Sequence, residues 1–297
     1  MAHSLFDISS LDPFVAEGCI FLTPNQRLSR RIASEWDASR VAAGERVWEP
    51  IPAYPLQEWL RQRWELAQRR GLLAPTLLLN RQQEQLLWRR AIERHTEDSD
   101  SPALLRPGGA AESASEARDM LLRFGVDPRS SRVRQLFGME PDSAVFLQWL
   151  DLFEDVLQRE SACTGADVLA ALAALEGELP GPPVVLVECG DVEPLVAAAL
   201  RSVSSGVHVA ARTSANAHCQ VHPFPDGRSE LLGVAGWAAA VNRESPGATV
   251  AIVMAGAGSE RVALEYLLRR EFDCLGENYN SLPVNFSAGI SLAEAPV

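Results

Sequence analysis

The chain has 297 residues, of which 47% are hydrophobic and 22% are charged, so it has the composition and length for two ordinary globular domains. Its net charge of −12 argues against a wholly basic nucleic-acid-binding surface, and no apolar run approaches the roughly 18 residues of a membrane span. All 27 basic residues are arginine, and the missing lysine excludes nucleotide hydrolysis by a P-loop, which needs the lysine of GK[ST] at the β- and γ-phosphates.

The first predicted element is a short buried strand over residues 19–23, which ends at Pro24. A helix of about 15 residues follows, because Leu28, Ile32 and Trp36 recur at i, i+4 and i+8. A strand and a helix in this order are the start of an α/β unit.

Helices dominate the next part of the chain. Val47–Trp48 predicts a short strand and EPIPAYP a turn, while Leu56–Arg70 predicts a helix with its tryptophans on one side. We expect residues 75–178 to form a mostly helical insertion. Its helices are expected from Asn80 to Glu93 and over 116–124, 132–137, 143–160 and 166–175, with HTEDSDSPALLRPGGAAESAS as a loop.

The periodicity changes after the helical insertion. The apolar run Val184–Val187 predicts a buried strand, a helix follows it, and residues 207–211 predict the next strand. This alternation is typical of a parallel sheet, so we expect an α/β fold for a first domain over residues 1–214.

A second, partial α/β domain is expected over residues 215–297. A helix is predicted from about Ser229 to about Asn242, a buried strand over 248–254, and a helix up to Phe272, with one more strand near the end of the chain.

The cysteines are scattered, and no two of them have the CxxC spacing of a zinc site: Cys19, Cys163, Cys189, Cys219 and Cys274. His218 and His222 lie near Cys219, but a fourth metal ligand is lacking there. We therefore expect reduced thiols in a cytoplasmic protein, with no metal and no cofactor in this chain. The N-terminal sequence MAHSLFDISSLDPF has no features of a signal peptide.

Basic residues are concentrated in one stretch. From Arg27 to Arg94 there are 13 arginines against 8 acidic residues, a net charge of +5. A locally basic stretch in an acidic protein can follow a phosphate backbone, because binding depends on the local field.

Two segments resemble nucleotide-binding motifs without completing them. AGAGS at 255–259 follows a predicted strand and opens a helix, but it lacks the third glycine of a dinucleotide-binding loop. VVLVECGD at 184–191 resembles a Walker B strand, with Glu188 and Asp191 as candidate acids, but no P-loop is present to hold phosphates. A plain turn and a plain core strand are the favoured interpretations, and no catalytic constellation is evident.

The segment LTPNQRLSRR at 22–31 is more informative. A strand that ends in Thr23 and opens a basic helix through Asn25 and Gln26 presents polar side chains and backbone N–H groups at the carboxyl edge of a sheet. α/β sheets bind ligands at this edge, and such groups suit a sugar–phosphate backbone.

Together these segments resemble the N-terminal, helicase-like part of AddB-type helicase–nucleases, in the group of probable DNA repair proteins with a RecB-like nuclease. The resemblance spans nearly the whole chain. It rests on the order of FLTPNQRLSRRIASEWD, GERVWEPIPAYPLQEWLRQRW, LLLNRQQEQLLWRRAIE, VVLVECGDVEPLVAAAL, FPDGRSELLGVAGWA and NFSAGISLAEAPV.

The resemblance implies a degenerate superfamily 1 helicase-like fold, and it assigns helicase motifs to particular residues of this chain. Motif Ia, which touches single-stranded DNA, matches Thr23, Asn25, Gln26 and Arg27, and Arg30 and Arg31 follow on the same helix. Glu188 stands where the Walker B aspartate is usual, and Arg261 falls in the helix after the motif IV strand.

The sequence departs from the family pattern where catalysis would take place. Only 18 residues precede Cys19 and none of them forms a P-loop, and the PD-(D/E)xK nuclease of the family is expected further downstream. We therefore expect a non-catalytic, DNA-binding or DNA-guiding module of a DNA-repair helicase or exonuclease, which supports a nuclease absent from this chain. Single-stranded or duplex-end DNA, and a partner helicase subunit, are the expected partners, with no membrane.

Two alternatives belong to other classes. One is a protein-interaction scaffold that docks a partner helicase without touching DNA. The other is a nucleotide-binding enzyme that uses the AGAGS loop.

Overall fold

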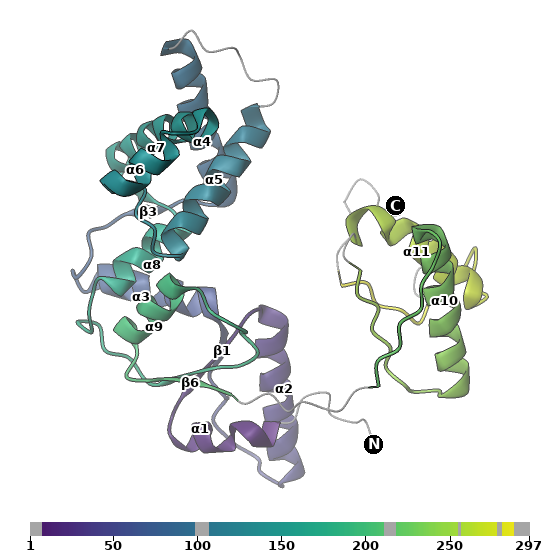
Figure 1. Ribbon diagram of the computed structural model, residues 1–297. Helices are drawn as coiled ribbons and strands as arrows, with labels where there is room; N and C mark the ends of the chain where they lie inside the picture. Colours follow the sequence, from purple (N-terminus) through teal and green to yellow (C-terminus); the bar gives the residue numbers. More distant parts are fainter. Residues whose placement is uncertain (1–7, 99–106, 211–217, 255–256, 278–280, 288–297) are drawn as a thin grey trace. The chain divides into compact units, whose positions relative to one another are not determined.

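The computed structural model describes residues 8–98, 107–210, 218–254, 257–277 and 281–287 (Figure 1). The chain divides into two compact units, residues 1–214 (unit 1) and 215–297 (unit 2).

Unit 1 is built on a four-stranded parallel sheet in the order β2-β1-β5-β6. The strands are β1 (Ile20–Thr23), β2 (Ala53–Pro55), β5 (Val184–Leu186) and β6 (Val207–Val209). Val185 of β5 is aligned with Phe21 of β1 on one side and with His208 of β6 on the other. The expected mixed α/β architecture with a parallel sheet is therefore confirmed.

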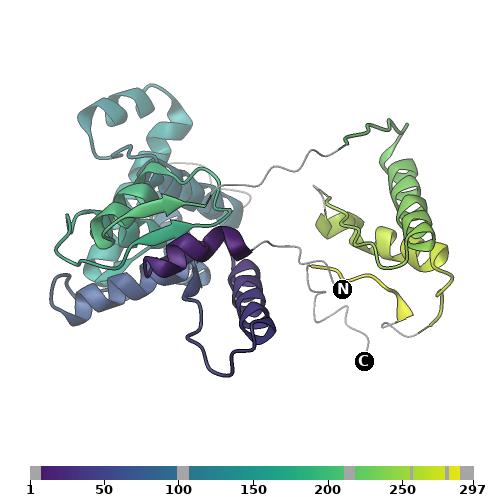
Figure 2. The ribbon, with the colours of Figure 1, turned by 90° about the horizontal axis from the view of Figure 1, so that it is seen from below.

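The two central strands are buried on both faces, which explains their continuous apolar sequences. Leu22 and Leu186 face helices α3 (Leu56–Arg69), α8 (Gly165–Ala173) and α9 (Pro194–Val203). Phe21 and Val185 face the opposite side, where α2 (Gln26–Ala42) packs together with η1 (Ile8–Leu11) and α1 (Asp12–Ala16). Figure 2 shows helices on both sides of the green β5 and β6 strands.

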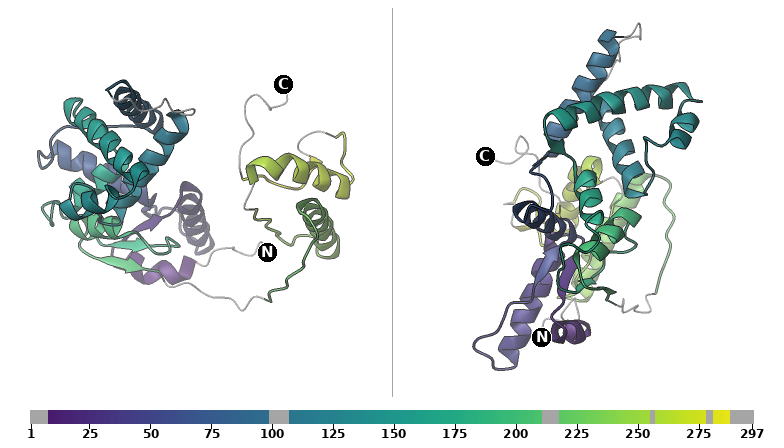
Figure 3. Two further views of the ribbon diagram at one scale, coloured as in Figure 1. Left: turned by 45° about the horizontal axis from the view of Figure 1, so that its top comes forward. Right: turned by 90° about the vertical axis from the view of Figure 1, so that its left-hand side faces the viewer.

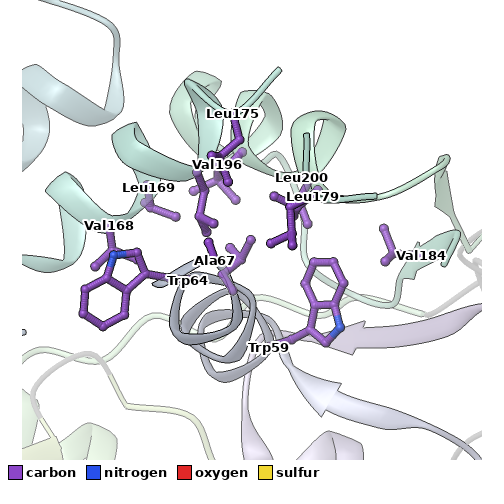
Figure 4. Close-up of a cluster of buried hydrophobic side chains, with 14 of the residues drawn as sticks. Trp59, Trp64, Ala67, Val168, Leu169, Leu175, Leu179, Val184, Val196 and Leu200 are labelled. Atoms are coloured by element: carbon purple, nitrogen blue, oxygen red, sulfur yellow. The ribbon is translucent and has the colours of Figure 1, made fainter. Parts of the chain in front are cut away.

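The core on the α3 side is rich in aromatic and branched residues. Trp59, Trp64 and Ala67 of α3 point toward α8 and α9, where they meet Leu169 and Leu200 (Figure 4). Burial of side chains of this size contributes about 1.5–3 kcal/mol each, so their packing stabilises α8 and α9 against α3.

The helical part of unit 1 contains α4 (Arg81–Asp98), α5 (Pro107–Arg123), α6 (Ser131–Phe137) and α7 (Pro141–Arg159). Figures 1 and 3 show these helices grouped at one end of the unit. A separate pair of two-residue parallel strands, β3 (Leu77–Leu78) and β4 (Ala162–Cys163), lies at the base of this group.

In unit 2 the described helices are α10 (Gly227–Glu244) and α11 (Ala257–Glu271), which pack against each other through Ala235, Ala238 and Leu268. The Asp226 carboxylate accepts a hydrogen bond from the Ser229 backbone N–H at 2.7 Å and caps α10.

Several predicted elements were wrong. Val47–Trp48 is not a strand; the second strand is β2, inside the segment predicted as a turn. β2 is an edge strand, so Pro55 is tolerated, and the Phe21 N–H donates to the Pro52 carbonyl at 2.9 Å.

The predicted loop before residue 116 is partly helical. α4 runs to Asp98 and α5 begins at Pro107, where a proline fits the first helical turn. Ala111 and Ala114 are buried against the α4–α7 core, so packing outweighs the glycine- and serine-rich composition. Residues 99–106 of the predicted loop lie outside the described residues.

The predicted strand over 248–254 is also wrong. These residues form no strand, and Val253 is 94% exposed. A strand needs a hydrogen-bonded neighbour, and the described part of unit 2 contains no other strand to pair with it. The last predicted strand is not found over 281–287, and residues 288–297 lie outside the described part.

No helix in the described ranges combines the length and apolar character needed to cross a bilayer.

Candidate nucleic-acid interface and sheet-edge cavity

The turn from β1 to α2 is organised by Thr23 and Asn25. The Thr23 side chain is fully buried, and its hydroxyl donates to the backbone carbonyls of Asn25 at 2.9 Å and Tyr54 at 3.3 Å. The Asn25 side-chain oxygen accepts from the Leu28 N–H at 3.0 Å and caps α2. These two predicted site residues therefore shape the turn, and the Thr23 hydroxyl is directed into the protein.

The next predicted residues lie on the protein surface. Gln26, Arg27, Arg30 and Arg31 are all exposed on the first turns of α2. Arg31 also forms an i,i+4 ion pair with Glu35 at 2.5 Å. The start of a helix carries a partial positive charge and backbone N–H donors, so these side chains reinforce a local preference for anions.

This helix start lies at the topological switch point of the sheet. The connection from β1 runs through α2 to β2 on one side, whereas β5 continues through α9 to β6 on the other. Ligands of open α/β sheets bind outside the carboxyl ends of the strands where the strand order reverses. Here that place lies between β1 and β5.

A cavity of about 490 Å³ opens at this edge. Pro24 follows β1, Leu56 begins the helix after β2, and Cys189 and Asp191 follow β5. The cavity therefore lies at the carboxyl ends of three strands, β1, β2 and β5.

The cavity has an apolar floor and a charged rim. The floor includes Leu60 of α3, Leu169 of α8 and Val196 of α9. The rim contains carboxylates and guanidinium groups from separate elements: Glu58, Arg61, Arg123, Asp191 and Glu193. A site of this kind can accept a ligand with both an apolar and a polar part.

The rim charges are largely paired with one another. Arg61 donates to Glu58 at 2.7 Å and also pairs with Glu65, and Arg123 lies 3.6 Å from Glu193. Hydrogen bonds from Arg61 and then Gln62 lower the pKa of Glu58. The carboxylates in this network compete with any phosphate for the arginines.

Glu188 and Asp191 occupy different places after β5. Asp191 is exposed and lines the cavity. Glu188 is exposed, is not among the cavity-lining residues, and has a left-handed φ of 54°. The two acids proposed for a Walker B position thus do not share one site.

Cys189 lines the cavity as a thiol. Its Sγ lies 3.4 Å from the Leu22 carbonyl, and burial raises its pKa. A raised pKa makes a thiol a weaker nucleophile at neutral pH.

Arg261 belongs to α11 in unit 2, where its guanidinium lies 4.9 Å from the ring centroid of Phe286. Of the AGAGS loop, Ala255 and Gly256 lie outside the described residues, and Ala257 begins α11. Arg261 therefore belongs to a different unit from the α2 residues.

Sequence reasoning missed Arg61, Arg123 and Glu193. They come from α3, α5 and the turn before α9, which lie far apart in the sequence, and no local motif marks them. The one available signal was that the residues after parallel strands collect at one sheet edge.

A second cavity, of about 650 Å³, lies in unit 2. Phe224, Gly233 and Trp237 line it together with His218 and His222. A Cβ atom on Gly233 would lie 2.5 Å from the Phe224 ring, so a larger residue there would require the ring to move.

No protein-family model matches the sequence, and no curated protein matches it significantly.

Proposed function

We propose that the chain is a non-catalytic, helicase-like module that binds single-stranded DNA across the start of α2. The observation that carries the proposal is the group of exposed side chains Gln26, Arg27, Arg30 and Arg31 at the carboxyl edge of the sheet, beside its switch point. Arginine is suited to phosphate recognition because its planar guanidinium donates two parallel hydrogen bonds.

The charge distribution supports a path over α2 rather than into the cavity. The α2 start presents Arg27, Arg30 and Arg31. On the cavity rim, Arg61 and Arg123 are paired with Glu58 and Glu193, and Asp191 adds a further negative charge. The rim therefore attracts phosphates less than the α2 start does, and the apolar floor is open to an uncharged part of a nucleotide.

The wider role proposed is that of a DNA-guiding part of a DNA-repair helicase or exonuclease. DNA cleavage would then belong to a nuclease outside this chain, and this chain would contribute affinity and direction. The absence of lysine is consistent with a module that does not hydrolyse ATP through a P-loop.

Arg27, Arg30 and Arg31 changed together to alanine are expected to weaken binding of single-stranded DNA. The slope of log K against log salt is negative, and each lost phosphate contact makes it less steep by about 0.7. Loss of three contacts therefore makes the slope less steep by about 2. Fluorescence anisotropy with a labelled oligonucleotide over a series of salt concentrations measures both quantities.

The matched control is Arg89, Arg90 and Arg94 changed to alanine. These arginines are exposed on α4, and replacing them removes the same charge as the first variant. A general electrostatic effect would therefore weaken DNA binding equally in both variants. Equal weakening, or no binding by the unchanged protein at low salt, would contradict the proposal.

Thr23→Val is expected to reduce stability and leave the salt slope unchanged. The buried hydroxyl donates only to backbone carbonyls in the described contacts, and losing these hydrogen bonds costs about 1–2 kcal/mol. Urea unfolding followed by circular dichroism, together with the same anisotropy series, checks both expectations. A changed salt slope in this variant would instead assign Thr23 to DNA contact.

The second candidate is a scaffold that docks a partner helicase without touching DNA. Exposed Val221, Phe224 and Trp237 in unit 2 favour it, because Phe224 and Trp237 line an open apolar cavity. If the folded protein shows no DNA binding in the anisotropy measurement, the scaffold function is favoured.

A further inference from the structure

Three different metal-ligating side chains converge in unit 1, away from the cavity-lining residues. One ligand atom from each of Glu17, Cys19 and His208 lies within 4.8 Å of the other two. Among the described residues this is the one group of three or more His, Cys, Asp or Glu side chains that are close enough to share an ion.

The sheet register places residues far apart in the sequence on one face of the sheet. Phe21 is aligned with Val185, and Val185 with His208, so these residues form one row across β1, β5 and β6. Cys19 stands two residues before Phe21 and belongs to the same core cluster, on the α1 and α2 side of the sheet.

The backbone around these ligands is fixed by short-range contacts. The Cys19 N–H donates to the Phe14 carbonyl at 3.0 Å, and Gly18 between Glu17 and Cys19 has a left-handed φ of 70°. The His208 ring packs against Phe14 with centroids 5.7 Å apart. A metal site requires this support, because ligands held by neighbouring packing lose little freedom on binding.

We propose that Glu17, Cys19 and His208 bind a zinc ion. A thiolate, an imidazole and a carboxylate are all common zinc ligands, and three protein ligands with water in the fourth position form an open tetrahedral site. Binding releases the thiol proton, and the thiolate and carboxylate together balance the charge of Zn²⁺, so the occupied site carries no net charge.

The ligand atoms must move slightly closer together to bind a zinc ion. Zinc bonds of about 2.0–2.3 Å place neighbouring ligand atoms about 3.5 Å apart. Cys19 Sγ lies 4.0 Å from the Glu17 carboxylate, and Glu17 and His208 are exposed and can turn toward a buried thiol. Because only Cys19 is buried, at 1% exposure, an ion can enter from solvent.

Cys163 and Cys274 show that burial alone does not make such a site. Both are buried, and neither belongs to a comparable group in the described part of the chain. The convergence of Glu17 and His208 distinguishes Cys19 from them.

The test uses Co²⁺ as a spectroscopic substitute for zinc on the reduced, chelator-treated full chain. One equivalent is expected to bind and to produce a thiolate-to-cobalt charge-transfer band, which one equivalent of Zn²⁺ then removes. The band is expected to be lost in Cys19→Ser. His208→Ala is expected to lower the affinity at least about tenfold, while circular dichroism shows an unchanged fold.

The control is Cys219→Ser combined with His222→Ala, which removes an exposed thiol and imidazole in unit 2. The cobalt band is expected to be unchanged in this variant. A band that is missing in the unchanged protein, survives Cys19→Ser, or disappears in the control overturns the proposal. If Cys19→Ser does not fold, Glu17→Gln and His208→Ala decide the matter, because both residues are exposed, and full cobalt affinity in both variants would overturn it.

Discussion

Replacing Arg118 with methionine is expected to lower the free energy of unfolding by about 3 kcal/mol, because it leaves the partly buried Asp167 carboxylate without its ion-pair partner. Arg118 in α5 is only 5% exposed. Its guanidinium donates to both carboxylate oxygens of Asp167 at 2.8 and 3.2 Å, and to the Thr164 hydroxyl at 3.0 Å. Its Nε lies 3.5 Å from Glu154 of α7.

The same contacts stabilise the first turn of α8, which lines the sheet-edge cavity. The Thr164 backbone N–H and hydroxyl donate to Asp167 at 2.9 and 2.8 Å, and these residues form the capping box of α8. Arg118 therefore joins α5 and α7 to the start of α8. Loss of Arg118 removes charge compensation and support for the cap together.

The expected loss depends on pH in a defined direction. Burial alone would raise the pKa of Asp167, but Arg118 and then Thr164 hold it below its ordinary value. A lowered folded-state pKa gives stability that is present above the unfolded pKa and is lost as the pH falls through the folded pKa. Arg118→Met removes the larger of the two partners that lower this pKa, so its deficit is expected to shrink as the pH falls from the unfolded pKa of aspartate through the folded pKa.

Urea unfolding at neutral and acidic pH measures this deficit, and Asp167→Asn completes a double-mutant cycle. Arg81→Met is the surface control, since Arg81 and Glu112 form an exposed pair at 2.5 Å whose loss should cost at most about 1 kcal/mol. Equal effects at Arg118 and Arg81, or a deficit that grows in acid, would show that the buried network does not act as described.

Trp88→Ala is expected to destabilise unit 1 by about 3–5 kcal/mol, the usual cost of removing a large core aromatic side chain. Trp88 in α4 is fully buried, and its ring stacks on Phe153 of α7 with centroids 4.0 Å apart and planes inclined by 7°. Phe146 lies on the same cluster at 6.4 Å. The side chain thus fills the space between α4 and α7.

Trp88→Phe separates packing from hydrogen bonding. The Trp88 indole N–H has no hydrogen-bond partner among the described residues, so phenylalanine removes a buried unsatisfied donor while keeping a ring. We expect this variant to lose much less stability than Trp88→Ala. Circular dichroism during urea unfolding provides the comparison, and Trp237→Ala is the control because Trp237 is 54% exposed. Equal losses of stability in the alanine and phenylalanine variants would contradict the conclusion that Trp88 stabilises unit 1 through the packing of its ring.

The sequence predicted the sheet best where burial controls the residue choice. β1 and β5 lie between helices on both faces, so their apolar runs identified them directly. β2 was not predicted because it is an edge strand that follows Pro52 and ends with Pro55, and β3 and β4 are too short for any periodicity. The segment 248–254 was mistaken for a strand because an apolar run does not reveal whether a pairing partner exists.

The candidate site was predictable only where it is local. The exposed Gln26 and Arg27 follow a recognisable strand-to-helix turn, whereas Arg61 and Arg123 reach the cavity from helices separated by the tertiary fold. The convergence of Cys19 and His208 likewise depends on strand order, which no spacing in the sequence contains.

The short β3–β4 pair has a consequence for how this molecule could change in evolution. Leu77 N–H donates to the Ser161 carbonyl and Leu79 N–H to the Cys163 carbonyl, at 2.8 and 2.9 Å, so the chain enters and leaves the α4–α7 group at one place. Changes in the length of α4, α6 or α7 would therefore leave the strand order of the sheet unchanged. α5 is more constrained, because Arg118 and Arg123 join it to α8 and to the turn before α9.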